Sequence, residues 1–415
     1  MNFFEELKWR GLVKDVTDEA AFIERLKSPL TLYCGFDPTA DSLHIGSLQQ
    51  LLLLRRYQDN GHTPIALLGG GTGMIGDPRP TSERQLLTLE QIRENGRHIR
   101  IQLDKFCKSS GPNALISLNN YDWLSQIDLL SFLRDYGKYF NINYMIAKDT
   151  IASRLDTGIS FTEFTYTILQ AIDFLHLYKN YNCELQIGGS DQWGNLTSGT
   201  ELIRKTVENS KVFGVTSPLI TNSDGSKFGK SEGQNVWLSN DRTSAYAFYQ
   251  YWLNVADADV IDFMKRLSLK TPTEIMAYEE GVKVEAHKRA AQLALAIELT
   301  ELVHGKEALE SAQKITQVFF SNLWHDLSLS ELQEALSSAP QYQCGQEENL
   351  IDTLVNAKIA VSKREARELI SNGSITINGE KQTDLEFMLK KENALHSSVT
   401  VIKKGKKTYC AVLFN

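Results

Sequence analysis

The sequence predicts an α/β fold in three parts: a domain with a parallel sheet, an α-helical domain and a small α+β domain. Three observations carry the prediction. Up to about residue 240, short apolar segments end in glycine-rich turns and alternate with helical patterns. Only helical patterns follow, and a basic helix with a short hairpin comes near the end. The predicted parts span residues 1–240, 241–325 and 349–415, with a linker at 326–348.

The bulk composition is that of a globular protein without a membrane partner. At 415 residues the chain is too long for one core, and its 42% hydrophobic and 23% charged residues are ordinary values. No apolar run approaches the ~20 residues of a membrane span, and residues 2–6 are acidic where a signal peptide would be basic. The five cysteines are scattered without a Cys-x-x-Cys pair, which favours a reducing compartment and argues against bound zinc. We therefore expect a cytoplasmic protein with no tightly bound metal.

Charge is distributed unevenly along the chain. The net charge of −7 argues by itself against a nucleic-acid partner. Residues 351–415, however, hold 11 Lys and Arg against 7 Asp and Glu, a net charge of +4 that leaves −11 for the rest. An acidic body with a basic tail is the pattern expected of an enzyme that carries an RNA-binding module.

The first strand leads through a turn into a helix. Thr31–Tyr33 reads as the end of an apolar strand, Gly35 lets the chain turn sharply, and a helix begins near His44. A helix N-terminus after such a turn presents free N–H groups and a positive dipole end to a phosphate. The spacing is not that of a Walker loop. Taken alone, His44 is more often a capping or exposed residue than a phosphate ligand.

This segment also resembles a family signature. Residues 33–40 read Tyr-Cys-Gly-Phe-Asp-Pro-Thr-Ala, and residues 43–46 read Leu-His-Ile-Gly. The second run resembles the His-Ile-Gly-His signature of class I aminoacyl-tRNA synthetases, and the first is similar to the bacterial tyrosyl enzymes in particular. The chain departs from the signature at Ser47, where the family has its second histidine. The resemblance implies a Rossmann-like catalytic domain that binds ATP and tyrosine.

The second strand, residues 64–68, is followed by glycines that fit two classes of enzyme. Gly71-x-Gly73-x-x-Gly76 matches the dinucleotide fingerprint, so a nicotinamide or flavin enzyme is an alternative. The match is weak, because the turn opens the second strand–helix step and the prolines after Asp77 break the helix that should start there. In the synthetase interpretation the glycines let the backbone pass close to a ligand, and Asp77 faces the amino acid.

A helix that follows Ser160 carries polar side chains on an element that should be buried. Apolar residues cover most of its circumference, yet Tyr166, Gln170 and Asp173 lie at i, i+4 and i+7. Buried polar groups need partners, and an internal network or a bound polar ligand would supply them equally well. In tyrosyl-tRNA synthetases the matching Tyr and Gln hold the α-ammonium of tyrosine, and the Asp accepts the phenolic hydroxyl.

Two further segments extend the resemblance through the first domain. The strand at 184–187 ends in Gly-Gly-Ser-Asp-Gln-Trp-Gly-Asn, and glycines followed by polar residues at a strand's carboxyl end suit a ligand crevice. Residues 221–233 are small, polar and rich in glycine, so they should form an irregular loop. Two lysines three residues apart are unremarkable alone. After the other motifs, Lys-Phe-Gly-Lys-Ser at 227–231 looks like the Lys-Met-Ser-Lys-Ser loop of the family.

The last part of the chain looks like an RNA-binding module. By resemblance the helical region from 241 is the anticodon-side domain, although its aromatic residues are expected in the core. Beyond it, a helix places Lys363, Arg364 and Arg367 on one face, and a strand with an Asn-Gly turn follows. A lone basic helix is usually a solvated face, but the helix–hairpin combination resembles an S4-type module. The second basic cluster comprises Lys403, Lys404, Lys406 and Lys407.

The resemblance assigns roles residue by residue. Catalytic donors are expected to be His44, Lys227 and Lys230, with Ser47 as a weaker donor and Arg84 as a possible assistant. The residues expected to bind tyrosine are Tyr33, Asp77, Tyr166, Gln170, Asp173 and Gln192. Those expected to bind ATP are Cys34, Gly35, Asp37, His44, Gly46, Gly189, Asp191 and Lys230. The tRNA contacts are expected at Lys363, Arg364 and Arg367, and Mg²⁺ is expected to arrive with ATP.

The activity implied is the ATP-dependent attachment of L-tyrosine to tRNA(Tyr) through tyrosyl-adenylate, by a homodimer. The tyrosine carboxylate is already ionised at pH 7, so activation needs alignment and donors for the pyrophosphate rather than a general base. Two alternatives stay open. A tryptophanyl enzyme of the same subclass is disfavoured by Tyr33 and Asp173, which can both bond a phenol. A regulatory RNA-binding protein with a decayed site would account for Ser47.

Overall fold

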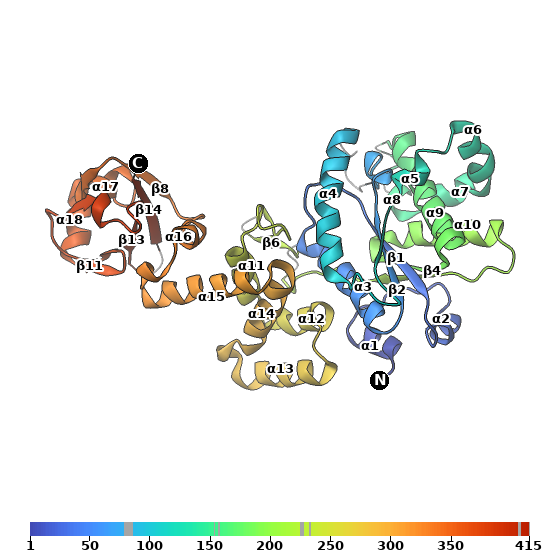
Figure 1. The fold of residues 1–415 in the computed structure, drawn as a ribbon, viewed down its shortest axis with the longest axis horizontal. Helices are drawn as coiled ribbons and strands as arrows, with labels where there is room; N and C mark the ends of the chain where they lie inside the picture. The colour runs from blue at the N-terminus through green and yellow to red at the C-terminus, as the bar shows by residue number, and fades with distance from the viewer. Residues whose placement is uncertain are drawn as a thin grey trace. The chain divides into compact units, whose positions relative to one another are not determined.

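The computed structural model describes residues 1–78, 86–152, 154–156, 158–224, 228–231, 234–405 and 408–414. The chain divides into two compact units, whose elements are labelled in Figure 1. The first unit comprises Met1–Thr243 and Tyr251–Val303, and the second comprises Ser244–Gln250 and His304–Asn415. Among the described residues no helix is long and apolar enough to cross a membrane.

A five-stranded parallel sheet forms the centre of the first unit. Its strands are β1 (Thr31–Phe36), β2 (Thr63–Leu68), β3 (Ile116–Asn119), β4 (Cys183–Gly189) and β5 (Phe213–Ser217). They lie in the order β3-β2-β1-β4-β5, so successive strands first build outward on one side of β1 and then on the other. The reversal leaves a crevice at the carboxyl ends of β1 and β4, where sheets of this type bind ligands. The predicted Rossmann-like α/β fold is confirmed.

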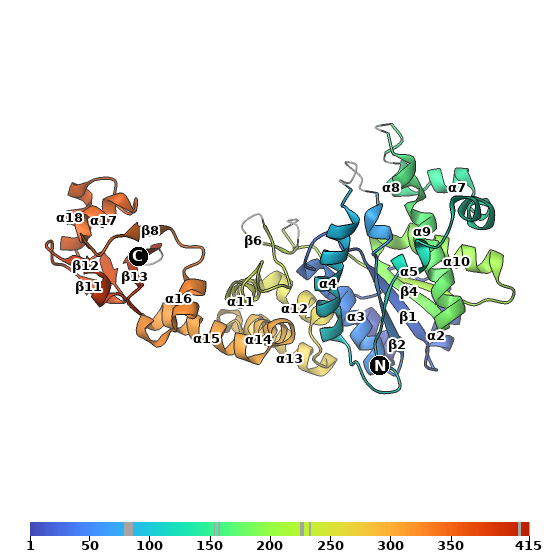
Figure 2. The same cartoon turned by 45° about the horizontal axis from the view of Figure 1, so that its top comes forward.

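Helices cover both faces of this sheet. Helices α3 (Leu48–Asp59) and α4 (Leu89–Phe106) cover one face, and α9 (Phe161–Tyr181) and α10 (Trp193–Thr206) cover the other (Figures 1 and 2). Ser160 begins α9 by accepting a hydrogen bond from the Glu163 backbone N–H at 3.2 Å. The remaining helices of this part are α1 (Phe3–Trp9), α2 (Glu19–Arg25), α5 (Tyr121–Leu124), α6 (Leu129–Ser131), α7 (Ile142–Ile146) and α8 (Asp149–Ala152).

Short strands and a series of helices follow the sheet. Strands β6 (Lys230–Ser231) and β7 (Gln234–Asn235) form an antiparallel pair. The helices that follow are α11 (Ala245–Leu253), α12 (Asp257–Leu267), α13 (Pro272–Glu285), α14 (Ala290–His304) and α15 (Lys306–Ser321). Of the aromatic side chains of this region that were expected in the core, Phe248, Tyr249 and Trp252 are buried, whereas Tyr246 and Tyr251 are half-buried.

The second unit contains a mixed sheet with the order β11-β10-β13-β14-β8. After α15, the elements of this unit are α16 (Leu329–Ala335), β8 (Gln341–Cys344), β9 (Glu347–Asn349), α17 (Leu350–Asn356), α18 (Lys363–Ser371), β10 (Ile375–Ile377), β11 (Glu380–Gln382), β12 (Met388–Lys390), β13 (Val399–Lys404) and β14 (Thr408–Phe414). The predicted Asn-Gly turn joins β10 to β11, and Asn378 and Gly379 both have positive φ, at 50° and 95°.

The segment at 326–348 is more regular than the linker expected from the sequence. It holds α16, β8 and most of β9, and strand β8 pairs with β14. Leu332 and Leu336 are buried in the same core as Ile315 and Val401. Apolar side chains from α15, α16 and the C-terminal strands therefore pack together in the second unit, while the four-part division of the chain stays a prediction.

Candidate active site

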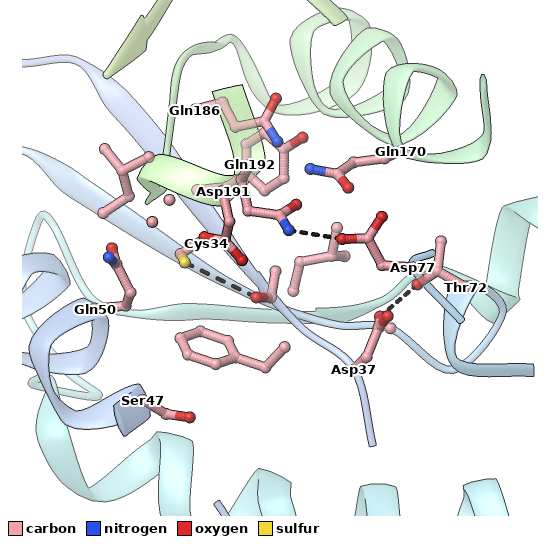
Figure 3. Close-up of a pocket in the computed structure, with 18 of the residues that line it drawn as sticks. Cys34, Asp37, Ser47, Gln50, Thr72, Asp77, Gln170, Gln186, Asp191 and Gln192 are labelled. Atoms are coloured by element: carbon pink, nitrogen blue, oxygen red, sulfur yellow. Dashed lines mark hydrogen bonds between the residues drawn. The ribbon is translucent and has the colours of Figure 1, made fainter. Parts of the chain in front are cut away.

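A cavity of about 380 Å³ lies at the carboxyl ends of β1 and β4 (Figure 3). It collects side chains from β1, the start of α3, the turn after β2, α9 and the turn after β4. The predicted site residues that line it are Tyr33, Cys34, Gly35, Asp37, His44, Gly46, Ser47, Asp77, Tyr166, Gln170, Asp173, Gly189, Asp191 and Gln192. Residues that are up to about 160 positions apart in the chain thus meet in one crevice.

The His-Ile-Gly-Ser segment presents a neutral imidazole at this cavity. Ile45–Ser47 forms a 3₁₀ turn directly before α3, so His44 precedes the helix rather than lying on its first turn. The Gly46 N–H donates to Nδ1 of His44 at 2.9 Å, which leaves the proton on Nε2. Partial burial lowers the pKa of His44, so the ring is uncharged at pH 7. A Cβ at Gly46 would come within 2.6 Å of the His44 ring, so glycine is required here.

The segment that carries Lys230 is attached to the same turn. The Ile45 N–H donates to the Val236 carbonyl at 3.0 Å, and the Val236 N–H donates to the Gly229 carbonyl at 2.8 Å. Lys230 lies in β6, paired with Asn235 of β7, and its side chain is exposed and does not line the cavity. The expected catalytic residue Lys227 lies outside the described residues, as do Arg84, Lys406 and Lys407.

The end of β1 is joined to α9 through a carboxylate. Asp37 accepts hydrogen bonds from Tyr166 Oη at 2.8 Å and from Thr72 Oγ1 at 2.7 Å. A Cβ at Gly69 would lie only 1.9 Å from Asp37 Oδ1, so this glycine after β2 makes room for the carboxylate. Burial and the negative charge of Asp37 raise the pKa of Tyr166, which therefore stays a hydrogen-bond donor.

The buried carboxyl group of Asp173 is held by two side chains from the region after β3. Asn120 Nδ2 donates to Oδ2 at 2.8 Å, and Trp123 Nε1 donates to Oδ1 at 2.8 Å. The Trp123 ring stacks on His176 with ring centres 4.1 Å apart, which fixes the indole. Burial raises the pKa of Asp173 to about 8, although the two hydrogen bonds lower it.

Tyr33 lies beside Asp173 with an unused hydroxyl. Its side chain is 1% exposed, and its Oη has no hydrogen-bond partner among the described residues. Burial raises the pKa of Tyr33, and the charge of Asp173 raises it further, so the two groups are close enough to interact. A buried hydroxyl without a partner is costly, which indicates that a ligand completes the hydrogen bonding here.

The segment after β2 brings a further carboxylate to the cavity, that of Asp77. Asp77 accepts hydrogen bonds from Gln192 Nε2 at 2.7 Å and from Asn195 Nδ2 at 3.2 Å. In Figure 3 the side chains of Gln170, Asp77 and Gln192 extend into the same part of the cavity. Cys34 offers no thiolate, because burial raises its pKa to about 12.

Sequence reasoning missed the groups that orient these carboxylates. They are Thr72, Asn120, Trp123 and Asn195. The sequence could have indicated a role for Asn120 in the site, because a polar residue directly after an apolar strand lies at the ligand-binding edge of a parallel sheet. Nothing in the sequence indicated a role for Trp123, since a tryptophan in a short helix is ordinarily a core residue.

The site offers little to a resident metal or a dinucleotide. No cluster of three His, Cys, Asp or Glu side chains within the described part of the chain could hold a metal ion. Of the fingerprint glycines, Gly71 precedes the 3₁₀ turn Thr72–Met74, Gly73 lies within it and Gly76 follows it, and the chain from there to Pro78 starts no α-helix. The helix N-terminus that would bind a pyrophosphate is therefore missing from residues 71–78.

The basic residues of α18 are presented to solvent. The helix buries Ala366 and Ile370 and exposes Lys363, Arg364 and Arg367. Lys363 pairs with Asp352 at 2.5 Å, whereas the two arginines have no ion pair among the described residues. In the second basic cluster, Lys403 donates to Asn322 Oδ1 at 3.1 Å and Lys404 to Glu365 at 3.1 Å, so these two lysines also serve the fold.

Fold and site together define a class I aminoacyl-tRNA synthetase, and comparison with known proteins agrees. The family model described as tRNA synthetases class I (W and Y) matches residues 25–321, and one described as the tyrosine–tRNA ligase SYY-like C-terminal domain matches residues 331–412. A tyrosine–tRNA ligase of Staphylococcus haemolyticus is 52% identical over 411 residues, with 98% of each chain covered. Tyrosine–tRNA ligase 1 of Bacillus cereus is 49% identical, with 100% of each chain covered. The chain belongs to the tyrosine–tRNA ligase family.

Solved structures place the fold in the same group. A C-terminally truncated mitochondrial tyrosyl-tRNA synthetase of Aspergillus nidulans has a TM-score of 0.67 and 31% identity, covering 76% of this chain and 94% of that one. A tryptophanyl-tRNA synthetase of Encephalitozoon cuniculi has a TM-score of 0.56 at 15% identity, covering 74% and 87%, which is a likeness of fold. The family predicted from the sequence motifs is confirmed, and the tyrosyl rather than the tryptophanyl branch is the one shown by the relatives.

Proposed function

We propose that this chain activates L-tyrosine with ATP, releasing pyrophosphate, and transfers the tyrosyl group from tyrosyl-adenylate to the 3′ end of tRNA(Tyr). The observation that carries the proposal is the cavity beneath the His-Ile-Gly-Ser turn. At one place in this cavity lie the buried carboxyl group of Asp173 and the hydroxyl of Tyr33, which has no hydrogen-bond partner among the described residues. At another place lies the neutral imidazole of His44, which can donate a hydrogen bond. The first place suits a phenol as the ligand group, and the second suits a phosphate.

The tyrosine subsite is proposed to read both ends of the amino acid. Asp173 accepts the phenolic hydrogen, and Tyr33 donates to the phenolic oxygen, which would satisfy its otherwise unpaired hydroxyl. Asp77, Tyr166 and Gln170 hold the α-ammonium, because a carboxylate and oxygen acceptors favour a cation. Gln192, which already donates to Asp77 at 2.7 Å, lies beside the reacting carboxylate.

The ATP subsite is proposed to use backbone and small side chains around β1 and β4. Cys34, Gly35 and Gly46 supply backbone close to the nucleotide, and Gly189 and Asp191 hold the ribose. Asp37 lies between the two substrates. Among the described residues no group of His, Cys, Asp and Glu side chains could hold a metal ion, and we propose that Mg²⁺ enters bound to the phosphates of ATP.

The chemistry needs alignment and charge stabilisation. The tyrosine carboxylate attacks the α-phosphate, and negative charge develops on the leaving pyrophosphate. His44 donates through Nε2–H without carrying charge, and Ser47 adds a shorter hydroxyl donor. Lys230, attached through β6 and Val236 to the same turn, and Lys227 are proposed to supply the positive charge that His44 lacks.

The basic face of α18 is proposed to bind tRNA. Arg364 and Arg367 are exposed and have no ion pair among the described residues, so their charges are available to phosphates. Lys363 is weakened for this role by its ion pair with Asp352. We place the protein in the cytoplasm, in keeping with its five free, buried cysteines.

We propose a homodimer because large apolar side chains are exposed along the segment that runs from α6 to the first residue of α9. They are Leu129 at 70% exposure, Leu130 at 75%, Leu133 at 50%, Ile142 at 57% and Phe161 at 72%. So many large apolar side chains in one segment indicate a protein interface, and a second copy is the proposed occupant. Leu130→Asp should shift sedimentation from dimer to monomer, while the exposed control Met276→Asp should not; a monomeric wild type would contradict the proposal.

ATP–pyrophosphate exchange with each of the twenty amino acids tests the activity. We expect exchange with tyrosine alone, followed by charging of tRNA(Tyr). Exchange with tryptophan instead would favour the other branch of the class. A folded chain that binds tRNA but exchanges with no amino acid would favour the decayed, regulatory alternative that Ser47 raised.

A further inference from the structure

A lysine outside the cavity connects the two helices that carry the amino-acid subsite. Lys148 lies in the turn between α7 and α8 and does not line the cavity. Its Nζ donates to Thr167 Oγ1 on α9 at 2.8 Å, to the Gly194 carbonyl on α10 at 2.8 Å, and to Ser198 Oγ on α10. An ammonium group has three donors, so all of its hydrogen-bonding capacity is used between these helices.

Two of the three partners of Lys148 are next in sequence to residues of the site or to residues that hydrogen-bond to it. Thr167 follows Tyr166, which bonds to Asp37. Gly194 lies between Gln192 and Asn195, the two residues that donate to Asp77. A shift of α10 along α9 would therefore change the distance between Asp77 and Tyr166, which are both proposed to hold the α-ammonium.

Retaining a charge at this half-buried place is costly. Burial lowers the pKa of Lys148 to about 8, and the negative charge of Asp77 opposes this shift. The aliphatic stem packs on Gly194, where a Cβ would lie 3.5 Å from Lys148 Cδ, and the ammonium lies 5.6 Å from the Tyr144 ring centre. An apolar side chain of similar length would fill this space without the cost of desolvating an ammonium.

We propose that Lys148 is a positioning residue for tyrosine activation, which holds the start of α10 against α9 and so sets Asp77 and Gln192 relative to Tyr166 and Gln170. The inference rests on the proposed function and deepens it. Lys148 acts through Gly194, Thr167 and Ser198 and touches neither substrate. Its loss should therefore weaken the use of tyrosine more than the use of ATP.

The test is tyrosine-dependent ATP–pyrophosphate exchange without tRNA. Lys148→Met keeps the length of the stem and removes the ammonium. We expect its KM for tyrosine to rise roughly tenfold to a hundredfold, since small displacements in a site have effects of that size. The KM for ATP should stay within about threefold. Lys148→Arg should recover part of the loss, because a guanidinium keeps the charge and several donors.

Control variants separate this role from a general loss of folding. Lys179→Met removes an exposed lysine of the same helix, α9, and should leave both KM values unchanged. The double variant Thr167→Val/Ser198→Ala removes two of the three partners and should raise the KM for tyrosine in the same direction. Circular dichroism and thermal unfolding verify that each variant is folded.

Two results would overturn the inference. One is a folded Lys148→Met whose KM for tyrosine stays within twofold of wild type. The other is a variant that exchanges normally but charges tRNA poorly, which would assign the lysine to the RNA. A wild-type chain that fails to exchange with tyrosine contradicts the proposed function instead, so the two failures are distinguishable.

Discussion

The hydroxyl of Tyr166 donates a hydrogen bond to Oδ2 of Asp37 at 2.8 Å. This bond joins α9 to the end of β1, and Thr72 binds the other carboxylate oxygen at 2.7 Å. Tyr166 is proposed to contact tyrosine and Asp37 to contact ATP, so one hydrogen bond links the two substrate subsites. The bond also gives the half-buried carboxylate a partner when neither substrate is bound.

Tyr166→Phe should weaken tyrosine binding by about tenfold, or about 1.5 kcal/mol. The variant removes a donor to the half-buried carboxylate of Asp37 and the oxygen that is proposed to face the α-ammonium, and hydrogen bonds to charged groups are worth about this much. The KM for tyrosine in pyrophosphate exchange measures the effect. Tyr178→Phe, on the same helix but away from the cavity, is the matched control. Unchanged tyrosine KM in Tyr166→Phe would show that this hydroxyl serves only the internal bond to Asp37.

Asp173→Ala should weaken tyrosine far more than phenylalanine. A site built to bond a hydroxyl leaves its own polar groups unpaired when the hydroxyl is absent, an effect for which tyrosyl-tRNA synthetases are themselves the standard example. In this chain Asn120 and Trp123 would also lose their acceptor. The ratio of kcat/KM for the two amino acids is the measurement. Equal losses for both would show that Asp173 does not read the phenol.

The same carboxyl group predicts a pH-dependent stability. Its pKa is raised by burial to about 8 in the folded chain, above the value of 3.8 expected when unfolded. The folded state therefore binds this proton more tightly, so the associated stability is present below the unfolded pKa and is lost as pH rises to about 8. Asp173→Asn removes this titration, although its amide NH2 must face one of the two donors, Asn120 or Trp123, and lose that hydrogen bond. The free energy of unfolding of the wild type, relative to that of the variant, should therefore fall by about 1–2 kcal/mol between pH 4.5 and pH 8.

Denaturant unfolding of both proteins between pH 4.5 and 8 checks this expectation. The wild type should lose stability relative to Asp173→Asn steadily as the pH rises. The control is Asp122→Asn, which changes an exposed carboxylate next to Trp123 in the chain. A difference that does not vary with pH would mean that Asp173 titrates alike in the folded and unfolded chains.

His44→Ala should lower kcat for activation with little change in tyrosine affinity. The neutral Nε2–H is proposed to donate only as charge develops on the phosphates, and loss of one such donor costs roughly 2.7–4 kcal/mol in comparable oxyanion sites. Ser47→Ala should cost less, about 1 kcal/mol, since its side chain is shorter than that of histidine and reaches less far into the site. Pre-steady-state formation of tyrosyl-adenylate measures each variant. If the serine variant is as damaging as the histidine variant, the hydroxyl has replaced the missing second histidine.

Arg364→Ala/Arg367→Ala should impair tRNA charging and leave tyrosine activation unchanged. Both guanidinium groups are exposed on α18, and removing each arginine–phosphate pair should reduce the salt dependence of binding by about one unit of slope. The KM for tRNA at several salt concentrations is the measurement. Lys390→Ala, which removes a lysine paired with Glu347 at 3.8 Å, is the control. These substitutions are preferable to a truncation at Pro340, which would expose the core around Trp324 and Leu332.

Local patterns in the sequence determined the family, the strand–turn–helix steps and part of the set of residues that line the cavity. The polar positions of α9, the Asn-Gly turn and the His-Ile-Gly-Ser run depend on residues close together in the chain, and their geometry follows from helical spacing and turn preferences. For this reason Tyr166, Gln170 and Asp173 could be grouped before the fold was known, and all three line the cavity.

Only the tertiary structure decided which distant groups pair. The sheet order β3-β2-β1-β4-β5 brings the end of β3 to α9, so that Asn120 and Trp123 meet Asp173, and it brings the turn after β2 to α10, so that Asp77 meets Gln192. Burial then raises the pKa of Asp173, and partial desolvation at the cavity edge lowers the pKa of His44. Such pairings and pKa values depend on packing between segments far apart in the chain, and no spacing within one segment encodes them.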